Sequence, residues 1–220
     1  MRPPDVLGVL VKAPEPGRVK TRLAADIGAV AAAALYLRLG REIVAECAAS
    51  RDHHTVVWCA PAEAGHAVVS WLRDLGVDEF IAQPRGGLGA RMSAAFRTSF
   101  GHGASRVLLI GSDCPGVDRA LLREAFDALG SADVVLGPTV DGGYYLIGLS
   151  APAPGLFRRV TWSTASVFGQ TMANAKRLGL AVAVLRELRD VDTVDDACAL
   201  DLIPDPIEID HTAFEPLGRN

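Results

Sequence analysis

Short apolar runs alternate with longer segments of helical periodicity along most of this chain. The runs have few polar interruptions, which is typical of strands covered on both faces of a sheet. We expect strands at 6–11, 55–60, 79–83, 106–111, 133–137, 144–149 and 180–185. We expect helices at 23–49, in the stretch that ends at 75, and at 90–100, 119–129, 163–178 and 193–200, with Ser163 or Thr164 as the N-cap of the helix over 163–178. The alternation predicts an α/β fold with crossover helices and a mostly parallel sheet.

Two of the expected strands, 133–137 and 144–149, are joined only by the segment PTVDGG. A connection this short cannot hold a crossover helix, so we expect an antiparallel pair inside the otherwise parallel sheet. The chain shows no internal repeat and no linker. We therefore expect one domain over 1–205, followed by a tail at 206–220 that is rich in proline and acid.

Composition and charge narrow the class of protein. The chain has 220 residues, of which 50% are apolar, enough to bury a full core in one domain. A net charge of −4 argues against a nucleic-acid partner. Four dispersed cysteines and five histidines form no zinc-binding pattern, and no apolar run is long enough to cross a membrane. We expect a reduced, cytoplasmic protein with no signal peptide and no membrane partner.

The loop after the first expected strand carries an unusual density of positive charge. Its sequence over 11–23 is VKAPEPGRVKTRL, in which two prolines prevent a helix and Gly17 permits a sharp turn. Two of the three lysines of the chain, Lys12 and Lys20, lie here together with Arg18 and Arg22. Loops at the carboxyl ends of buried strands often hold ligands, and lysine binds phosphate as a point charge. The loop indicates a phosphate site, with a solvated charged turn as the alternative.

An aspartate follows the strand expected at 106–111. Asp113 lies in GSDCPG, where a carboxylate typically holds Mg²⁺ or Mn²⁺, which in turn holds a diphosphate. The alternative role is the N-cap of the next helix, for which Asp118 is better placed. Cys114 has no histidine near it in sequence, so we interpret it as a small packed residue and not as a nucleophile.

A second acidic cluster, DVDTVDD over 190–196, lies between the last expected strand and the last expected helix. Asp192 or Thr193 can cap that helix, and the acids after them suit its first turn. This role does not account for Asp190, which lies at the end of the strand. Either Asp190 or Asp192 would complete a two-point cradle with Asp113 for a divalent ion that bridges phosphates.

Two further loops are candidates for substrate contacts. The segment PRGGLGARM over 84–92 offers glycine amides and Arg91 at a helix start, which suits a base, a ribose or a phosphate. Neither the dinucleotide-binding GxGxxG nor the P-loop motif occurs in the chain. In GPTVDGGYYLIGL over 137–149, Asp141 and Gly142 favour a hairpin, while two glycines beside an acid let a ligand approach the backbone.

Taken together, VKAPEPGRVKTRL, GLGARMSAAF, GSDCP, VVLGPTVDGGYYLIGL, VTWSTASVF and DVDTVDDA resemble a family of bacterial GT-A-like transferases described as glycosyltransferases of arsenosugar biosynthesis gene clusters. More remotely, the chain is similar to the guanylyltransferases that activate phospholactate or phosphoenolpyruvate, and to molybdenum-cofactor nucleotidyltransferases. The resemblance extends to about Leu202. It implies a nucleotide-diphospho-sugar transferase fold, a three-layer α/β/α sandwich with one antiparallel strand.

The resemblance also implies a site. Its nucleotide-binding residues would be Lys12, Ala13, Pro14, Gly17, Lys20, Arg22, Gly87, Gly89 and Arg91. Metal, Mg²⁺ or Mn²⁺, would lie at Asp113 and in the segment of Asp190 and Asp192. Acceptor contacts would come from Asp141, Gly142, Gly143, Tyr144, Trp162, Ser163 and Thr164. The first loop lacks the glycine-rich AGGxGxRM form of many sugar nucleotidyltransferases, so the donor type stays open.

Two reactions fit these residues. In glycosyl transfer from an NDP-sugar to a small-molecule acceptor, metal and cations hold the departing diphosphate while Asp141 deprotonates an acceptor hydroxyl. In nucleotidyl transfer from an NTP to a phosphorylated acceptor, Lys20, Arg22 and the metal stabilise departing pyrophosphate. The cation density favours nucleotidyl transfer and the family description favours glycosyl transfer, which is the function we expect. A non-catalytic nucleotide-binding module ranks last, because the metal carboxylates are intact.

Overall fold

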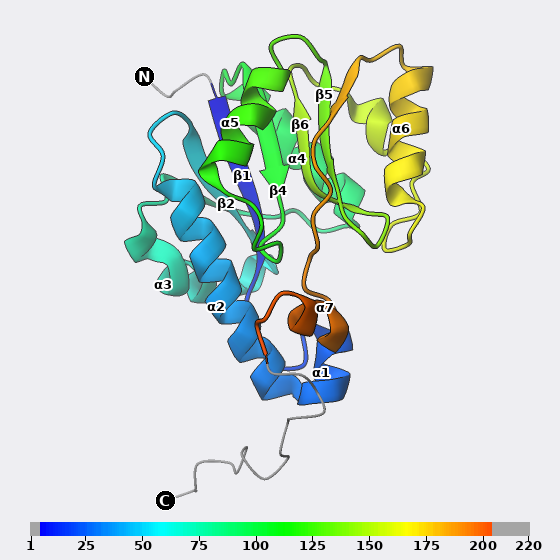
Figure 1. Ribbon diagram of the computed structural model, residues 1–220. Coiled ribbons are helices and arrows are strands. Elements are labelled where there is room, and N and C mark those ends of the chain that lie inside the picture. Colours follow the sequence, from blue (N-terminus) through cyan, green and yellow to red (C-terminus); the bar gives the residue numbers. More distant parts are fainter. Residues whose placement is uncertain (1–4, 204–220) are drawn as a thin grey trace, which may run out of the picture.

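A single seven-stranded sheet forms the centre of the computed structural model, which describes residues 5–203 (Figure 1). The strands are β1 (Asp5–Lys12), β2 (His54–Ala60), β3 (Glu79–Ala82), β4 (Arg106–Ile110), β5 (Val134–Pro138), β6 (Tyr144–Leu149) and β7 (Val182–Val184). The helices are α1 (Thr21–Ile27), α2 (Ala29–Ala48), α3 (Gly65–Leu72), α4 (Leu88–Gly101), α5 (Arg119–Ala128), α6 (Val167–Arg177) and α7 (Val194–Ala199). The tail expected at 206–220 lies outside the described residues.

The strand order is β3-β2-β1-β4-β6-β5-β7, and β6 alone runs against the others in this sheet. It pairs antiparallel with β5, as the short connection between them predicts, and also with β4. The predicted α/β class and the mostly parallel sheet are therefore confirmed. β1 and β4 are parallel, and β4 and β5 point the same way because each pairs antiparallel with β6 between them. The carboxyl ends of β1, β4 and β5 therefore lie at one edge of the sheet, and the loops that follow them meet there.

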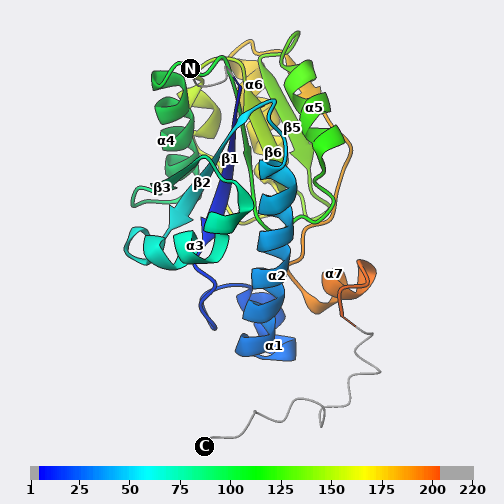
Figure 2. The same cartoon turned by 90° about the vertical axis from the view of Figure 1, so that its left-hand side faces the viewer.

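Helices cover both faces of the sheet, which makes the predicted three layers. Figure 2 shows α4 on one side and α2 with α5 on the other. Side chains of β4 lie alternately on the two faces of the sheet. Leu108 and Ile110 pack with α2, α3 and α5, whereas Val107 and Leu109 pack with α4 and α6. This period of two is the physical reason for the near-continuous apolar runs, since a strand buried on both faces needs apolar side chains at every position.

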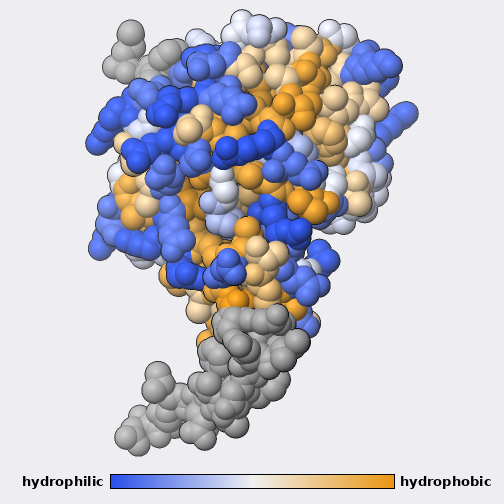
Figure 3. All heavy atoms as spheres, viewed as in Figure 1, coloured by the Kyte–Doolittle hydropathy of each residue, from blue (hydrophilic) through white to orange (hydrophobic). Residues whose placement is uncertain are grey.

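The helix predicted over 23–49 is two helices that meet at Gly28. This glycine ends α1 and begins α2 with φ +85°, a conformation that glycine adopts without strain. The apolar periodicity continues across the break, so the sequence pattern did not reveal it. The break lets α1 fold back on α2, and Leu23 of α1, Leu39 of α2 and Ala197 of α7 form one apolar cluster beyond the carboxyl edge of the sheet (Figure 1). Figure 3 shows apolar surface at this end of the molecule.

The helix predicted over 163–178 begins only at Val167, so neither Ser163 nor Thr164 is its N-cap. Ser166 holds that position, and the Phe168 amide donates to the Gly142 carbonyl at 2.9 Å. A tertiary contact with the turn between β5 and β6 therefore decides where α6 starts. Ser163 belongs to the preceding loop and has φ +62°. No helix among residues 5–203 is both long and apolar enough to span a bilayer.

Candidate active site

Parallel pairing of β1 with β4 brings the first loop beside the GSDCPG loop. The Tyr36 hydroxyl on α2 joins the two strand ends, because it accepts a hydrogen bond from the Lys12 amide at 3.0 Å and lies 2.9 Å from Ser112 Oγ. Tyr36 and Ser112 are both buried. The position of Asp113 is thus fixed through its neighbour. Sequence reasoning missed Tyr36, which carries no motif and lies within a helical pattern.

Lys20 is the centre of the site. Its Nζ donates to Asp113 Oδ2 at 2.9 Å and to Asp192 Oδ1 at 3.0 Å, and only 6% of its side chain is exposed. Burial acts to lower the pKa of Lys20, but the two carboxylates outweigh burial and hold the pKa above its ordinary value. The residue has φ +46° and ψ +47°, a left-handed conformation that is rare for a side chain of this kind. One buried ammonium therefore sits between two carboxylates from distant segments.

Backbone bonds attach the DVDT segment to the GSDCPG loop. The Val191 amide donates to the Asp113 carbonyl at 3.0 Å, and Cys114 Sγ lies 3.5 Å from the Arg189 carbonyl. Cys114 is buried, and burial raises the pKa of its thiol to about 12, so the structure bears out its interpretation as a packed residue. These contacts position Asp192 beside Lys20, although the two residues are far apart in the sequence.

Two of the expected helix caps are confirmed. The carboxylate of Asp118 accepts from the Leu121 amide at 2.7 Å at the start of α5. Thr193 caps α7 in a reciprocal capping box with Asp196. Since Thr193 and not Asp192 is the cap, the side chain of Asp192 is available to Lys20.

Asp190 lies near the charges of this cluster but does not contact Lys20. Burial raises the pKa of Asp190 to about 6, and the negative charges of Asp113, Asp141 and Asp192 act in the same direction. Four carboxylates thus converge near the carboxyl edge. The structure pairs only Asp113 and Asp192 through a shared cation.

The donor set fits a metal ion that arrives with phosphates. Within residues 5–203, no three His, Cys, Asp or Glu side chains group closely enough to hold a metal by themselves. Mg²⁺, however, is usually bound by one or two carboxylates together with substrate phosphates. Asp113 and Asp192 provide such a pair, and the Lys20 ammonium between them shows that their oxygens accommodate a cation.

Among the other residues predicted in and beside the first loop, Arg22 approaches the pair from the first turn of α1. Arg22 Nη1 lies 3.6 Å from Asp192 Oδ2, with 66% of its side chain exposed. Gly17 turns the loop with φ +78°, as predicted. The Ala13 amide donates to the Ala60 carbonyl at 2.7 Å, which ties the loop to the end of β2, while the side chain of Lys12 is exposed. Pro14 is half-buried beside it.

The glycine loop before α4 is held by a residue that sequence reasoning missed. Buried Gln83 donates through Nε2 to the Trp58 carbonyl at 2.7 Å, and its Oε1 lies 3.5 Å from Arg91 Nη1. Arg91 also donates to the Gly86 carbonyl at 2.9 Å. Gly87 occupies the N-cap of α4 without a side-chain cap, which leaves first-turn amides of the kind that bind anions. The only signal in the sequence was a polar residue at the end of a strand.

The glycine loop and the expected acceptor loop touch each other. A Cβ atom at Gly89 would lie 2.6 Å from Trp162 Cζ2, so the indole packs directly on the start of α4. At Gly142, with φ +86°, a Cβ atom would lie 2.2 Å from the Ala165 carbonyl oxygen. Thr164 Oγ1 donates to the Thr161 carbonyl at 2.7 Å within the same loop. Packing therefore explains both glycines, and it places Trp162 at the carboxyl edge.

The other expected acceptor residues have local partners. Asp141 Oδ1 accepts from the Gly143 amide at 2.9 Å and from Thr139 Oγ1 at 2.6 Å, which closes the predicted turn. The Tyr144 hydroxyl points to Met92 Sδ, 4.0 Å away. Tyr144 thus packs on the face covered by α4, and the structure does not turn its hydroxyl toward the acceptor loop.

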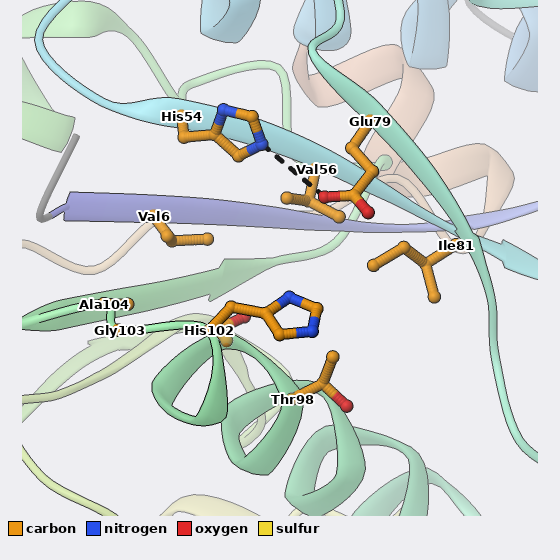
Figure 4. Close-up of a pocket in the computed structure, with 10 residues that line it drawn as sticks. Val6, His54, Val56, Glu79, Ile81, Thr98, His102, Gly103 and Ala104 are labelled. Atoms are coloured by element: carbon orange, nitrogen blue, oxygen red, sulfur yellow. Dashed lines mark ion pairs between the residues drawn. The ribbon is translucent and has the colours of Figure 1, made fainter. Parts of the chain in front are cut away.

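A separate cavity lies at the opposite edge of the sheet, near the beginning of β1 and the end of α4 (Figure 4). His54 Nε2 lies 3.6 Å from Glu79 Oε2 in its wall, and His102 lies across the cavity from them. None of the residues predicted for the site lines this cavity.

Comparison with known proteins agrees with this fold. A protein from Desulfovibrio desulfuricans G20, named provisionally as a nucleotide-diphospho-sugar transferase, is 34% identical, with 90% of this chain and 86% of that chain covered and a TM-score of 0.83. Rv0371c of Mycobacterium tuberculosis H37Rv, in complex with manganese, is 20% identical over 89% of this chain and 97% of its own, with a TM-score of 0.52. The inositol-1-phosphate CTP transferase of T. maritima is 14% identical over 94% of this chain and 98% of its own, with a TM-score of 0.55. The predicted nucleotide-diphospho-sugar transferase fold is confirmed.

No curated protein matches the chain. Residues 43–164 match the family described as an uncharacterized protein conserved in bacteria, DUF2064. The match extends from the second half of α2 to the loop that contains Trp162, so it includes the GSDCPG loop and the β5–β6 turn. With this match over more than half of its length, and with the Desulfovibrio relative alike over nearly all of it, the chain belongs to the DUF2064 family.

Proposed function

We propose that this protein is a divalent-metal-dependent transferase with a nucleotide donor, and that it moves a glycosyl unit from an NDP-sugar to a small-molecule acceptor. The observation that carries the proposal is the pair Asp113 and Asp192, which share the cation of Lys20 at the carboxyl edge of the sheet. A nucleoside diphosphate needs such a site, because charge develops on it as the sugar leaves. The provisional name of the Desulfovibrio relative supports the same class of donor.

Different residues of the chain would bind the metal ion, the phosphates and the rest of the nucleotide. Asp113 and Asp192 would hold Mg²⁺ or Mn²⁺, which supplies positive charge to the departing diphosphate. Lys20 and Arg22 would add cations on the same phosphates. The amides at Gly87 and Gly89 would receive a further part of the nucleotide, together with Arg91. The manganese complex of the fold relative from M. tuberculosis is consistent with this division.

On the acceptor side, Asp141 is the proposed general base. The turn holds its Oδ1 through two hydrogen bonds, while its Oδ2 accepts none within residues 5–203. A carboxylate that is fixed by one oxygen and open at the other can take the proton of an acceptor hydroxyl. Trp162 would form an apolar wall for the acceptor, and Ser163 and Thr164 would offer hydroxyls to it.

Nucleotidyl transfer is the second candidate. The observation that favours it is the density of cations in the first loop, because pyrophosphate carries more negative charge than a nucleoside diphosphate bonded to a departing sugar. The fold relative from T. maritima is itself a CTP transferase. In this reaction an acceptor phosphate attacks the α-phosphorus of an NTP, and Lys20 and Arg22 stabilise the pyrophosphate that leaves.

The products separate the two reactions. NDP-sugars and NTPs are each incubated with Mg²⁺ or Mn²⁺ and a panel of acceptors, and the release of NDP and of pyrophosphate is measured. We expect NDP release from an NDP-sugar, including slow hydrolysis without acceptor. Release of pyrophosphate with a phosphorylated acceptor would establish the alternative, and nucleotide binding without either product would favour a non-catalytic module.

The control compares two aspartates of the same loop. Asp113→Asn should abolish metal-dependent nucleotide binding, whereas Asp118→Asn should retain it, because asparagine still caps α5. Binding is measured by the rise in melting temperature that a ligand causes through mass action. Complete absence of nucleotide binding to the unaltered protein would refute both transfer reactions.

A further inference from the structure

The Lys20 ammonium and a divalent metal ion compete for the same oxygens. Nζ lies 2.9 Å from Asp113 Oδ2 and 3.0 Å from Asp192 Oδ1. A Mg²⁺ ion bound to those carboxylates would lie about 2.0–2.1 Å from each ligand oxygen. The space between the two carboxylates therefore has room for one cation, and in this structure that cation belongs to the chain itself.

A metal ion that displaces the Lys20 ammonium from the two carboxylates leaves this ammonium without a negatively charged partner. Its side chain is only 6% exposed, whereas the two carboxylates are 37% and 38% exposed. An ammonium that is buried and loses its counter-charges is strongly unfavourable. Phosphate oxygens from a nucleotide would supply the missing negative charge in the same place, but a free metal ion would not.

We infer that Lys20 is an exchangeable counter-cation, which occupies the carboxylate pair in the free protein, opposes the binding of free divalent metal, and transfers to the nucleotide phosphates when metal and nucleotide bind together. This inference rests on the proposed function, since it uses the same site. It makes metal and nucleotide binding mutually dependent, and such coupling is reciprocal. Each ligand should therefore bind weakly alone and tightly with the other.

Arg22 provides a matched comparison. It lies two residues after Lys20 in the first turn of α1, carries the same charge and approaches Asp192 at 3.6 Å. It makes no ion pair with Asp113 within the described part of the chain, and it is largely exposed. Removing its charge changes the local potential but leaves the ammonium between the carboxylates.

Mn²⁺ binding tests the inference directly, by the paramagnetic resonance signal of the free ion. In the absence of nucleotide, Lys20→Met should bind Mn²⁺ about tenfold or more tightly than the unaltered protein, and Arg22→Met should change little. Adding Asp113→Asn to Lys20→Met should remove the gain. In the unaltered protein, UDP or GDP should tighten Mn²⁺ binding, and Lys20→Met should weaken that coupling.

A second measurement needs no variant. The chain has three lysines, so acetic anhydride labelling followed by mass spectrometry resolves Lys20 from exposed Lys12 and Lys176. Lys20 should react slowly in the free protein, faster with saturating Mn²⁺ alone, and slowly again with Mn²⁺ and nucleotide. Exposed Lys176, which lies outside the proposed site, serves as the internal reference.

The inference is overturned if Lys20→Met binds free Mn²⁺ no more tightly than the unaltered protein, if Arg22→Met gains as much, or if bound Mn²⁺ leaves Lys20 labelling unchanged. A failure of the proposed function has a different signature. No nucleotide would then bind in the presence of metal, while the comparison of free Mn²⁺ binding would still decide whether Lys20 opposes the metal.

Discussion

Lys20, Asp113 and Asp192 satisfy one another's charges at the carboxyl edge, although 93 and 172 positions in the sequence separate the lysine from its two partners. The neighbouring acidic residues have different roles. Asp196 completes the cap of α7, Asp141 closes a turn, and the pKa of Asp190 is raised. The role of an acid in this cluster therefore depends on its contacts and not on its place in the motif.

Asp192→Asn and Thr193→Ala should separate metal binding from capping. Asp192→Asn should weaken metal-dependent nucleotide binding about tenfold or more, and it should also lower the free energy of unfolding, because buried Lys20 loses one of its two counter-charges. Thr193→Ala should lower that free energy by about 1 kcal/mol and leave binding intact, because it removes only the cap. Urea unfolding and thermal-shift titration measure the two quantities. Equal binding losses in both variants would contradict the assignment of Asp192.

Two connections between elements determine the shape of the site. Gly28 turns α1 back against α2, so that Lys20 reaches the carboxylate pair from the start of α1. At the other end of α2, His53 Nε2 lies 3.0 Å from the Cys47 carbonyl and must donate to it, which joins the end of this helix to the start of β2. Both connections hold helices relative to the sheet, and both can be tested through stability.

Gly28→Ala should lower the free energy of unfolding by about 1–2 kcal/mol, because φ +85° is unfavourable for a residue with a Cβ atom. Gly101→Ala is its counterpart. Gly101 lies in α4 with no atom near its missing Cβ, so this change should be neutral or stabilising by about 0.4–1 kcal/mol. Urea denaturation measures both variants. A stable Gly28→Ala protein would contradict the strained break between the helices.

His53 should give stability a pH dependence. Burial lowers the pKa of His53 below 6.5, so the unfolded chain takes up this proton at a higher pH than the folded protein. Stability from this group is therefore complete above about pH 7 and declines as the pH falls through about 6.5. His53→Gln should remove that decline, and His66→Gln, on the exposed face of α3, should retain it. The free energy of unfolding of the unaltered protein and of both variants is measured from above pH 7 to below about pH 6.5. An unaltered decline in His53→Gln would exclude His53 as its source.

Over the whole molecule, the two halves of the sheet contribute different parts of the site. β1, β2 and β3 with their loops provide the basic loop and the glycine loop, whereas β4, β5 and β6 provide Asp113 and the turn of Asp141. Contact between Gly89 and Trp162 joins these halves at the carboxyl edge. The similarity to the glycosyltransferases of arsenosugar gene clusters stays a prediction, as do the single-domain boundaries.

Gly89→Ala should disturb both halves together. Its Cβ atom would lie within 2.8 Å of three indole atoms of Trp162, so the ring must move, at a cost of about 1–3 kcal/mol. We expect weaker binding of donor and acceptor alike. Gly87→Ala, with nothing near its missing Cβ, should leave the indole in place and should lower the free energy of unfolding less than Gly89→Ala does. Unfolding and product assays on both variants measure the effect, and an unchanged Gly89→Ala protein would contradict the packing.

The sequence by itself determined what depends on local pattern. Apolar runs specified the strands, the short PTVDGG connection specified the antiparallel pair, and charged or glycine-rich loops at strand ends indicated the edge that carries the chemistry. These features follow from periodicity and chain length, because a strand or a turn is decided within a few residues.

Only the tertiary structure decided which distant groups meet. It paired Asp113 with Asp192 and not with Asp190, placed the Lys20 ammonium between them, and began α6 at Val167 through a contact with Gly142. It also gave Tyr36 and Gln83 their positions at the strand ends. The physical reason is that these contacts join segments that are separated by 25 residues or more, so their energies depend on how helices and loops pack on the sheet, which no local pattern contains.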